Sequence, residues 1–157
     1  MLKTVGLPSI EDISGYESGE FTPTFVPSGT GFTSITYNAA TGGRYVKVGK
    51  LVHVQMWIQT DATTLGSASG VLRVGGLPFT AAASNGSTLD GYSALSVSYG
   101  DGFATNGAQF AHVRPNSKLV DLYAHNQTTG APGTQLTASN MGTGAVALQL
   151  SGTYIAA

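Results

Sequence analysis

Hydrophobic and polar residues alternate along most of this chain, most regularly in the stretch LVHVQMWIQT at residues 51–60. Every second residue of this stretch, beginning with Val52, is apolar or small enough to be buried. A period of two residues is typical of a β-strand with one buried face. The preceding segment GRYVKV (43–48) is joined to it by Gly49-Lys50, and glycine at the first position of a two-residue loop favours a type II′ turn. We therefore predict a β-hairpin here.

The two faces of the second hairpin strand differ in composition. One face is purely apolar and is expected to point into the core; its residues are Val52, Val54, Met56 and Ile58. The other face is mixed, with the only Trp of the chain flanked by amides, which suits a partly covered or subunit-facing surface. From this face we take His53, Gln55 and Trp57 as candidates for a subunit interface.

Similar strand patterns recur along the chain, with turn signals roughly every 8–12 residues and no helix of convincing length. The predicted strands, about eight or nine with the hairpin, lie in segments 21–27, 32–38, 71–86, 91–102, 109–114, 118–125 and 144–157. The first is expected at a sheet edge, because Pro23 cannot donate a hydrogen bond to a central ladder. In 91–102, one face is expected to hold Ser93, Leu95, Val97 and Tyr99. The pattern predicts an all-β domain, namely a two-sheet sandwich of the jelly-roll type.

Residues 1–20 differ from the rest, because apolar residues are irregularly spaced and Gly6 and Pro8 interrupt any helix. A frayed terminus is one interpretation. The other is an extended arm that docks on a partner, followed by one folded domain over residues 21–157. The apolar side chains that would make this contact are Leu2, Val5, Leu7, Ile10 and Ile13.

Composition narrows the class of partner. The chain has 157 residues, 22 of them glycine, with 10% charged residues and a net charge of −1. No basic stripe is present, so we expect no nucleic-acid partner. Such low charge indicates either a surface coated with Ser, Thr and Asn or one covered by partner subunits. The chain has no Cys, no continuous apolar stretch typical of a signal peptide and no run approaching ~20 apolar residues, so we expect no membrane partner.

Residues able to carry out chemistry are scattered. No Cys or acidic residue stands at metal-ligand spacing from the three histidines, which are His53, His112 and His125. The aspartates outside the arm occur singly, at Asp61, Asp90, Asp101 and Asp121. A nucleophile elbow and a phosphate-binding loop are both missing. We therefore predict no enzymatic activity, no metal and no cofactor, although acids from distant strands could still converge as a glycosidase pair requires.

Four segments in a fixed order carry a resemblance: GEFTPTF (19–25), GRYVKVGKLVHVQMWI (43–58), VLRVGGLPFTA (71–81) and LQLSGTYIA (148–156). Together they resemble a β module that recurs in virion proteins of tailed bacteriophages, and the resemblance covers roughly residues 19–155. It implies a trimeric jelly roll in a tail fibre, a tailspike end, a head fibre or a capsid decoration (cement) protein. The matching residues are turn glycines, core residues and an edge proline, so no binding site is carried over.

The chain has no coiled-coil or repetitive shaft, and an arm with one domain suits direct attachment to a capsid. We therefore expect a non-enzymatic decoration protein, assembled in the host cytoplasm, whose homotrimer binds the major capsid protein on the outer head surface and stabilises the shell. The alternative is a tail-fibre or tail-tip module that recognises host surface glycan through aromatic residues such as Tyr92 or Tyr99. A glycan-cleaving enzyme is a third hypothesis.

Overall fold

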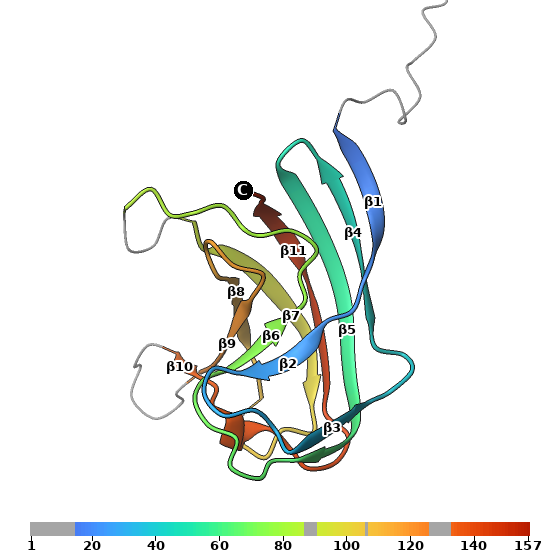
Figure 1. Cartoon of the computed structure of the whole chain (residues 1–157), viewed down its shortest axis with the longest axis vertical. Helices are drawn as coiled ribbons and strands as arrows, with labels where there is room; N and C mark the ends of the chain where they lie inside the picture. The colour runs from blue at the N-terminus through green and yellow to red at the C-terminus, as the bar shows by residue number, and fades with distance from the viewer. Residues whose placement is uncertain (1–14, 87–90, 106, 126–132) are drawn as a thin grey trace, which may run out of the picture.

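The computed structural model describes residues 15–86, 91–105, 107–125 and 133–157, which form an all-β structure, as predicted (Figure 1). A 3-10 turn, η2 (Ala138–Asn140), lies among the described strands. None of the helical structure in these residues is long and apolar enough to cross a membrane. The strands are β1 (Tyr16–Phe21), β2 (Thr24–Pro27), β3 (Ser34–Tyr37), β4 (Gly42–Val48), β5 (Leu51–Thr64), β6 (Leu72–Gly75), β7 (Ser93–Asp101), β8 (Phe110–Val113), β9 (Val120–Ala124), β10 (Thr134–Gln135) and β11 (Ala147–Ile155).

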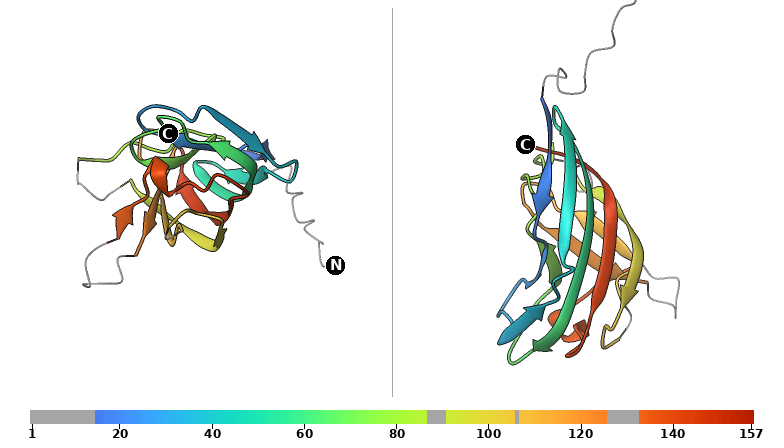
Figure 2. Two further views of the ribbon diagram at one scale, coloured as in Figure 1. Left: turned by 90° about the horizontal axis from the view of Figure 1, so that it is seen from below. Right: turned by 90° about the vertical axis from the view of Figure 1, so that its right-hand side faces the viewer.

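Antiparallel pairing joins these strands into one sheet in the order β1-β4-β5-β11-β7-β8-β9-β6-β2. In addition, β3 pairs with the end of β5, and β10 pairs with β9. The sheet curls into a half-barrel around its core (Figure 2), so the pairing does not divide into the two sheets of the predicted sandwich. The strands β1 and β2 lie at opposite ends of this order, yet only Thr22 and Pro23 separate them. One short segment therefore passes from one edge of the curled sheet to the other.

The N-terminal boundary differs from the sequence prediction. β1 begins at Tyr16 and pairs along its whole length with β4, from Tyr16 opposite Val48 to Phe21 opposite Gly43. Residues 16–20, predicted as part of the arm, therefore belong to the sheet, because strand pairing continues N-terminal to the GEFTPTF segment. The predicted docking residues Leu2, Val5, Leu7, Ile10 and Ile13 lie outside the described residues.

The central hairpin is confirmed. β4 and β5 are joined by Gly49, whose φ of 59° followed by a Lys50 without positive φ fits the type II′ turn. The strand face predicted to be buried is buried, with exposed fractions of at most 1% for Val52, Val54, Met56 and Ile58. The segments 109–114 and 118–125 form the hairpin of β8 and β9, with Asn116 in the left-handed region at its turn.

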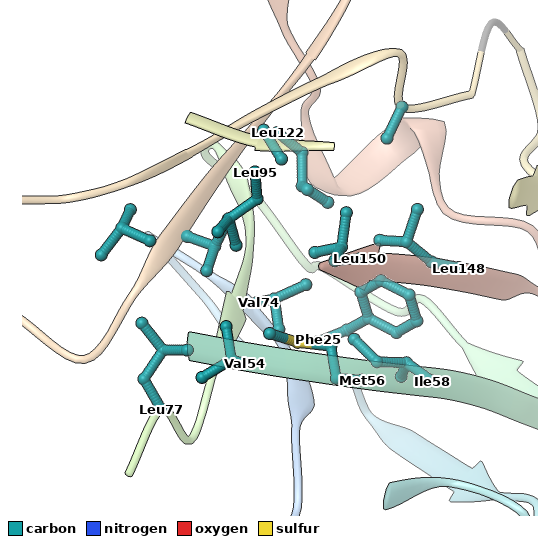
Figure 3. Packing of buried hydrophobic residues seen from close by; sticks show 14 of the residues in the cluster. Phe25, Val54, Met56, Ile58, Val74, Leu77, Leu95, Leu122, Leu148 and Leu150 are labelled. Atoms are coloured by element: carbon teal, nitrogen blue, oxygen red, sulfur yellow. The ribbon is translucent and has the colours of Figure 1, made fainter. Parts of the chain in front are cut away.

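The core lies inside the curl, where β5 and β11 meet the strands of the opposite wall. Figure 3 shows Met56 and Ile58 of β5 beside Leu148 and Leu150 of β11, with Phe25 of β2 reaching across to them. Burying each of these side chains contributes about 1.5–3 kcal/mol. The inner face is therefore occupied by packing, which leaves the outer face of the sheet accessible to solvent.

Candidate functional site

The outer face of the sheet is organised in cross-strand rows. Because β4, β5 and β11 pair in register, Gly42 lies opposite Trp57, and Trp57 lies opposite Gln149. Gln149 in turn lies opposite Tyr99 of β7. These four residues form a single row across four strands, and we call it the Trp57 row.

A β-bulge brings Tyr99 to this row. Leu150 lies opposite Val97, but its neighbour Gln149 lies opposite Tyr99, so Ser98 has no partner. One extra residue reverses the alternation of the strand beyond it. Tyr99, predicted to share a face with Leu95 and Val97, therefore points to the outer face, while Leu95 is buried.

The side chains of Trp57 and Tyr99 stack on each other above Gln149. Their ring centroids are 5.5 Å apart and the rings are inclined by 29°. The polar edge of each ring is also engaged: Trp57 Nε1 donates to Gln59 Oε1 at 3.2 Å, and the Tyr99 hydroxyl donates to Asp101 Oδ2 at 3.4 Å. Tyr99 is 46% exposed, so the pair presents an ordered aromatic surface to solvent.

A groove of about 670 Å³ lies beside this aromatic pair, lined among others by Thr41, Gly42, Gln55, Trp57 and Gln149. A Cβ placed on Gly42 would meet no atom within 4 Å, so the missing side chain opens the floor of the groove. The wall is the turn before β4, which is held by Thr41. Its Oγ1 donates to the carbonyl of Gln59 at 2.8 Å and accepts from the amide of Gln59 at 3.0 Å.

The groove carries little net charge. Its rim contains Glu20 and Arg44, which form an ion pair at 3.5 Å with both side chains about 80% exposed. The side-chain amides of Gln55 and Gln149 have no hydrogen-bond partner among the described residues. An amide both donates and accepts, so these two groups offer unoccupied hydrogen-bonding capacity beside the aromatic surface.

The predicted interface residues all lie on this outer face. His53 and Gln55 are exposed, and Trp57 is half-buried against Tyr99. Nδ1 of His53 lies 3.3 Å from Oγ1 of Thr153. Contact of these residues with another copy of the chain stays a prediction. Gln55 and Trp57 also line the groove.

The other two histidines lie among different rings. His112 packs 5.2 Å from the ring of Tyr123 and 6.2 Å from that of Tyr92, whereas His125 lies 6.3 Å from Phe110. Within the described ranges, no three His, Asp or Glu side chains form a group that could hold a metal ion. Asp90 lies outside the described residues.

Sequence reasoning missed a buried ion cluster on the opposite wall. Asp121, treated as one scattered acid, is 1% exposed and accepts from Arg73 Nε at 2.7 Å and Arg114 Nη1 at 3.3 Å. The available signal was its position between Val120 and Leu122 in a strand, where an acid needs a cationic partner. Because both arginines bind the same buried carboxylate, this cluster stabilises the fold.

No protein-family model matches the chain, and no curated protein matches it significantly. A search of solved structures finds the crystal structure of the Dettilon tailspike protein (gp208), with a TM-score of 0.67 and 17% sequence identity. The match covers 89% of this chain and 24% of the tailspike chain, so this chain spans about a quarter of that protein's length. Similarity at this identity establishes a shared fold.

Proposed function

We propose that this chain is a non-enzymatic structural module of a tailed-phage virion, carried on the tail, that recognises a glycan on the host surface. The observation that carries the proposal is the ordered Trp57–Tyr99 stack beside an open groove on the outer face of the sheet. The fold shared with a tailspike protein supports the tail as its location.

The arrangement of the groove suits a sugar. A pyranose ring has an apolar face of C–H groups and a belt of hydroxyls around its edge. Aromatic rings pack against such a face, and the amides of Gln55 and Gln149 can donate to and accept from the hydroxyls. Ligand sites commonly combine an apolar wall with a few polar groups that fix orientation.

Self-association, expected to give a homotrimer, can leave this groove open. Four aliphatic side chains, each 41–51% exposed, occupy the far end of the same face: Val46, Val48, Leu51 and Ile155. An exposed apolar patch of this kind is typical of a protein–protein contact. A trimer that instead buried His53, Gln55 and Trp57 would close the groove, so the two uses of Trp57 exclude each other.

The competing function is a decoration protein on the outer capsid surface, which depends on the N-terminal arm and the major capsid protein. Immunogold labelling of purified particles with antibody against the chain separates the two. We expect label at the tail and none across the head. Label distributed over the head would contradict the tail location and support decoration, because a symmetric shell offers many equivalent sites.

Binding is tested with the soluble chain, which should block adsorption of phage to host cells in a dose-dependent manner. When the chain is incubated with the purified host polysaccharide, no new reducing ends should be released from the polysaccharide. Cleavage of the polysaccharide would contradict the non-enzymatic assignment. If phage adsorption is unchanged at a saturating concentration of the chain, the chain does not recognise the host surface.

A further inference from the structure

We propose that the groove beside Trp57 takes a neutral hexose-containing oligosaccharide, and that the absent side chain at Gly42 determines whether the sugar fits. This inference rests on the proposed function, since it names the ligand class and the seat of recognition. It is carried by three observations: the shape of the groove, its free hydrogen-bonding groups and its charge.

The shape comes from two neighbouring positions of the Trp57 row. Tyr99 packs against Trp57 from the β7 side, while Gly42 lies opposite Trp57 on the β4 side. No atom lies within 4 Å of where a Gly42 Cβ would be, so space remains open on that side of the tryptophan. Gly42 is the first residue of β4, and a residue without a side chain allows a ligand to approach the backbone closely. The sugar ring therefore fits over Gly42, beside Trp57.

The size of the groove agrees with a short oligosaccharide. Its volume of about 670 Å³ falls within the roughly 300–1,000 Å³ of small-molecule sites. A second hollow in the described structure, beside His125 and Gln135, has only about 190 Å³ and falls below that range. Of these two hollows, the groove at Gly42 is therefore the better candidate for a ligand site.

The charge of the groove selects a neutral sugar. Recognition of a carboxylate or phosphate favours Arg or Lys free to form charge-assisted hydrogen bonds. Arg44, the one cation among the described residues that line the groove, is paired with Glu20, so the two charges cancel at the rim. Two further polar side chains that line the groove, Gln55 and Gln149, are neutral amides that match hydroxyl groups. An acidic sugar would therefore find no unpaired cation among the lining residues to balance its charge.

The experiment uses the full chain on an array of oligosaccharides, neutral ones built from glucose, galactose, mannose or rhamnose and acidic ones containing uronic acid or sialic acid. We expect binding to neutral members and none to acidic ones. Gly42→Val should weaken that binding at least tenfold, about 1.4 kcal/mol, because valine fills the floor of the groove. Trp57→Ala should weaken it by a similar factor.

Gly31→Val is the matched control, because a Cβ there also meets no atom within 4 Å and Gly31 does not line the groove. Gly31→Val should bind oligosaccharides like the natural chain. The natural chain, Gly42→Val and Gly31→Val should all unfold at similar temperatures. A Gly42→Val protein that keeps both its fold and its affinity would show that the ligand sits elsewhere. Equal binding of acidic oligosaccharides, or no binding to any array member, would overturn the neutral class.

Blocking of phage adsorption by the same variants distinguishes failure of this inference from failure of the proposed function. If the natural chain and Gly42→Val block adsorption equally, host recognition stands and the groove is not its seat. If neither protein blocks adsorption and the natural chain binds no oligosaccharide of the array, both the proposed host recognition and the ligand site in the groove are wrong. If only Gly42→Val loses blocking, the groove is the seat of recognition.

Discussion

The buried cluster of Asp121 with two arginines allows a sharp test of how this fold is held together. The Asp121 side chain is 1% exposed, Arg73 is 17% exposed and Arg114 is 41% exposed. Asp121→Asn removes the negative charge while keeping the size of the side chain. It leaves the guanidinium of Arg73 largely buried without its counter-ion.

The magnitude follows from the unequal burial of the two arginines. Removing one partner of a fully buried ion pair costs about 3–5 kcal/mol, because the other charge is left uncompensated. An exposed pair contributes about 1 kcal/mol or less. Arg114 is exposed enough to turn toward water, so we expect Asp121→Asn to cost about 3 kcal/mol, at the lower end of the buried range. By the same reasoning, Arg73→Met should cost about 2–3 kcal/mol and Arg114→Met about 1 kcal/mol or less.

Urea denaturation followed by the fluorescence of Trp57, the only tryptophan, measures these differences at one protein concentration. The slopes of the unfolding free energy against urea should agree between variants, so that the midpoints report stability alone. Equal losses for Arg73→Met and Arg114→Met would refute the argument from burial. So would a loss below about 1 kcal/mol for Asp121→Asn.

Two further predictions concern a buried phenol and two adjacent glycines. Burial raises the pKa of Tyr154 from 10.0 to about 12, so its proton is held more tightly in the folded state. Relative to Tyr154→Phe, the natural chain should therefore lose about 2.7 kcal/mol of unfolding free energy between pH 10 and pH 12, at about 1.36 kcal/mol per pH unit. The difference between the two proteins in urea titrations isolates this phenol, because the pKa values of Tyr37 and Tyr45 are raised as well; parallel curves would contradict the prediction. A Cβ on Gly43 would lie 2.5 Å from the ring of Phe21, whereas one on Gly42 meets nothing. Gly43→Ala should thus cost about 1–3 kcal/mol and lower the melting temperature, while Gly42→Ala should not; equal melting temperatures would show that Phe21 moves aside freely.

The local part of the fold could be predicted because alternation within one strand reports which face is buried. Val52 to Ile58 on one face, the turn at Gly49 and the hairpin around Asn116 all depend on residues close in sequence. Each agrees with the structure for that reason.

What the sequence did not reveal depends on pairing between distant strands. The curl into one sheet is closed by the passage from β1 to β2 through Pro23, which was predicted only as a mark of an edge. The start of β1 at Tyr16 depends on the length of β4. The burial of Asp121 depends on Arg73, 48 residues away in the chain. None of these is visible as a period or a spacing.

The candidate site itself arises where the regular pattern of the sheet is broken twice in one row. In a strand without the bulge at Ser98, Tyr99 would point toward the core and Trp57 would lack its stacking partner. In a strand with an ordinary residue in place of Gly42, a side chain would occupy the groove. The bulge leaves Ser98 unpaired, and Gly42, the first residue of β4, contributes no side chain to packing. Both act on the surroundings of Trp57, so the proposed ligand site at this tryptophan depends on the two features together.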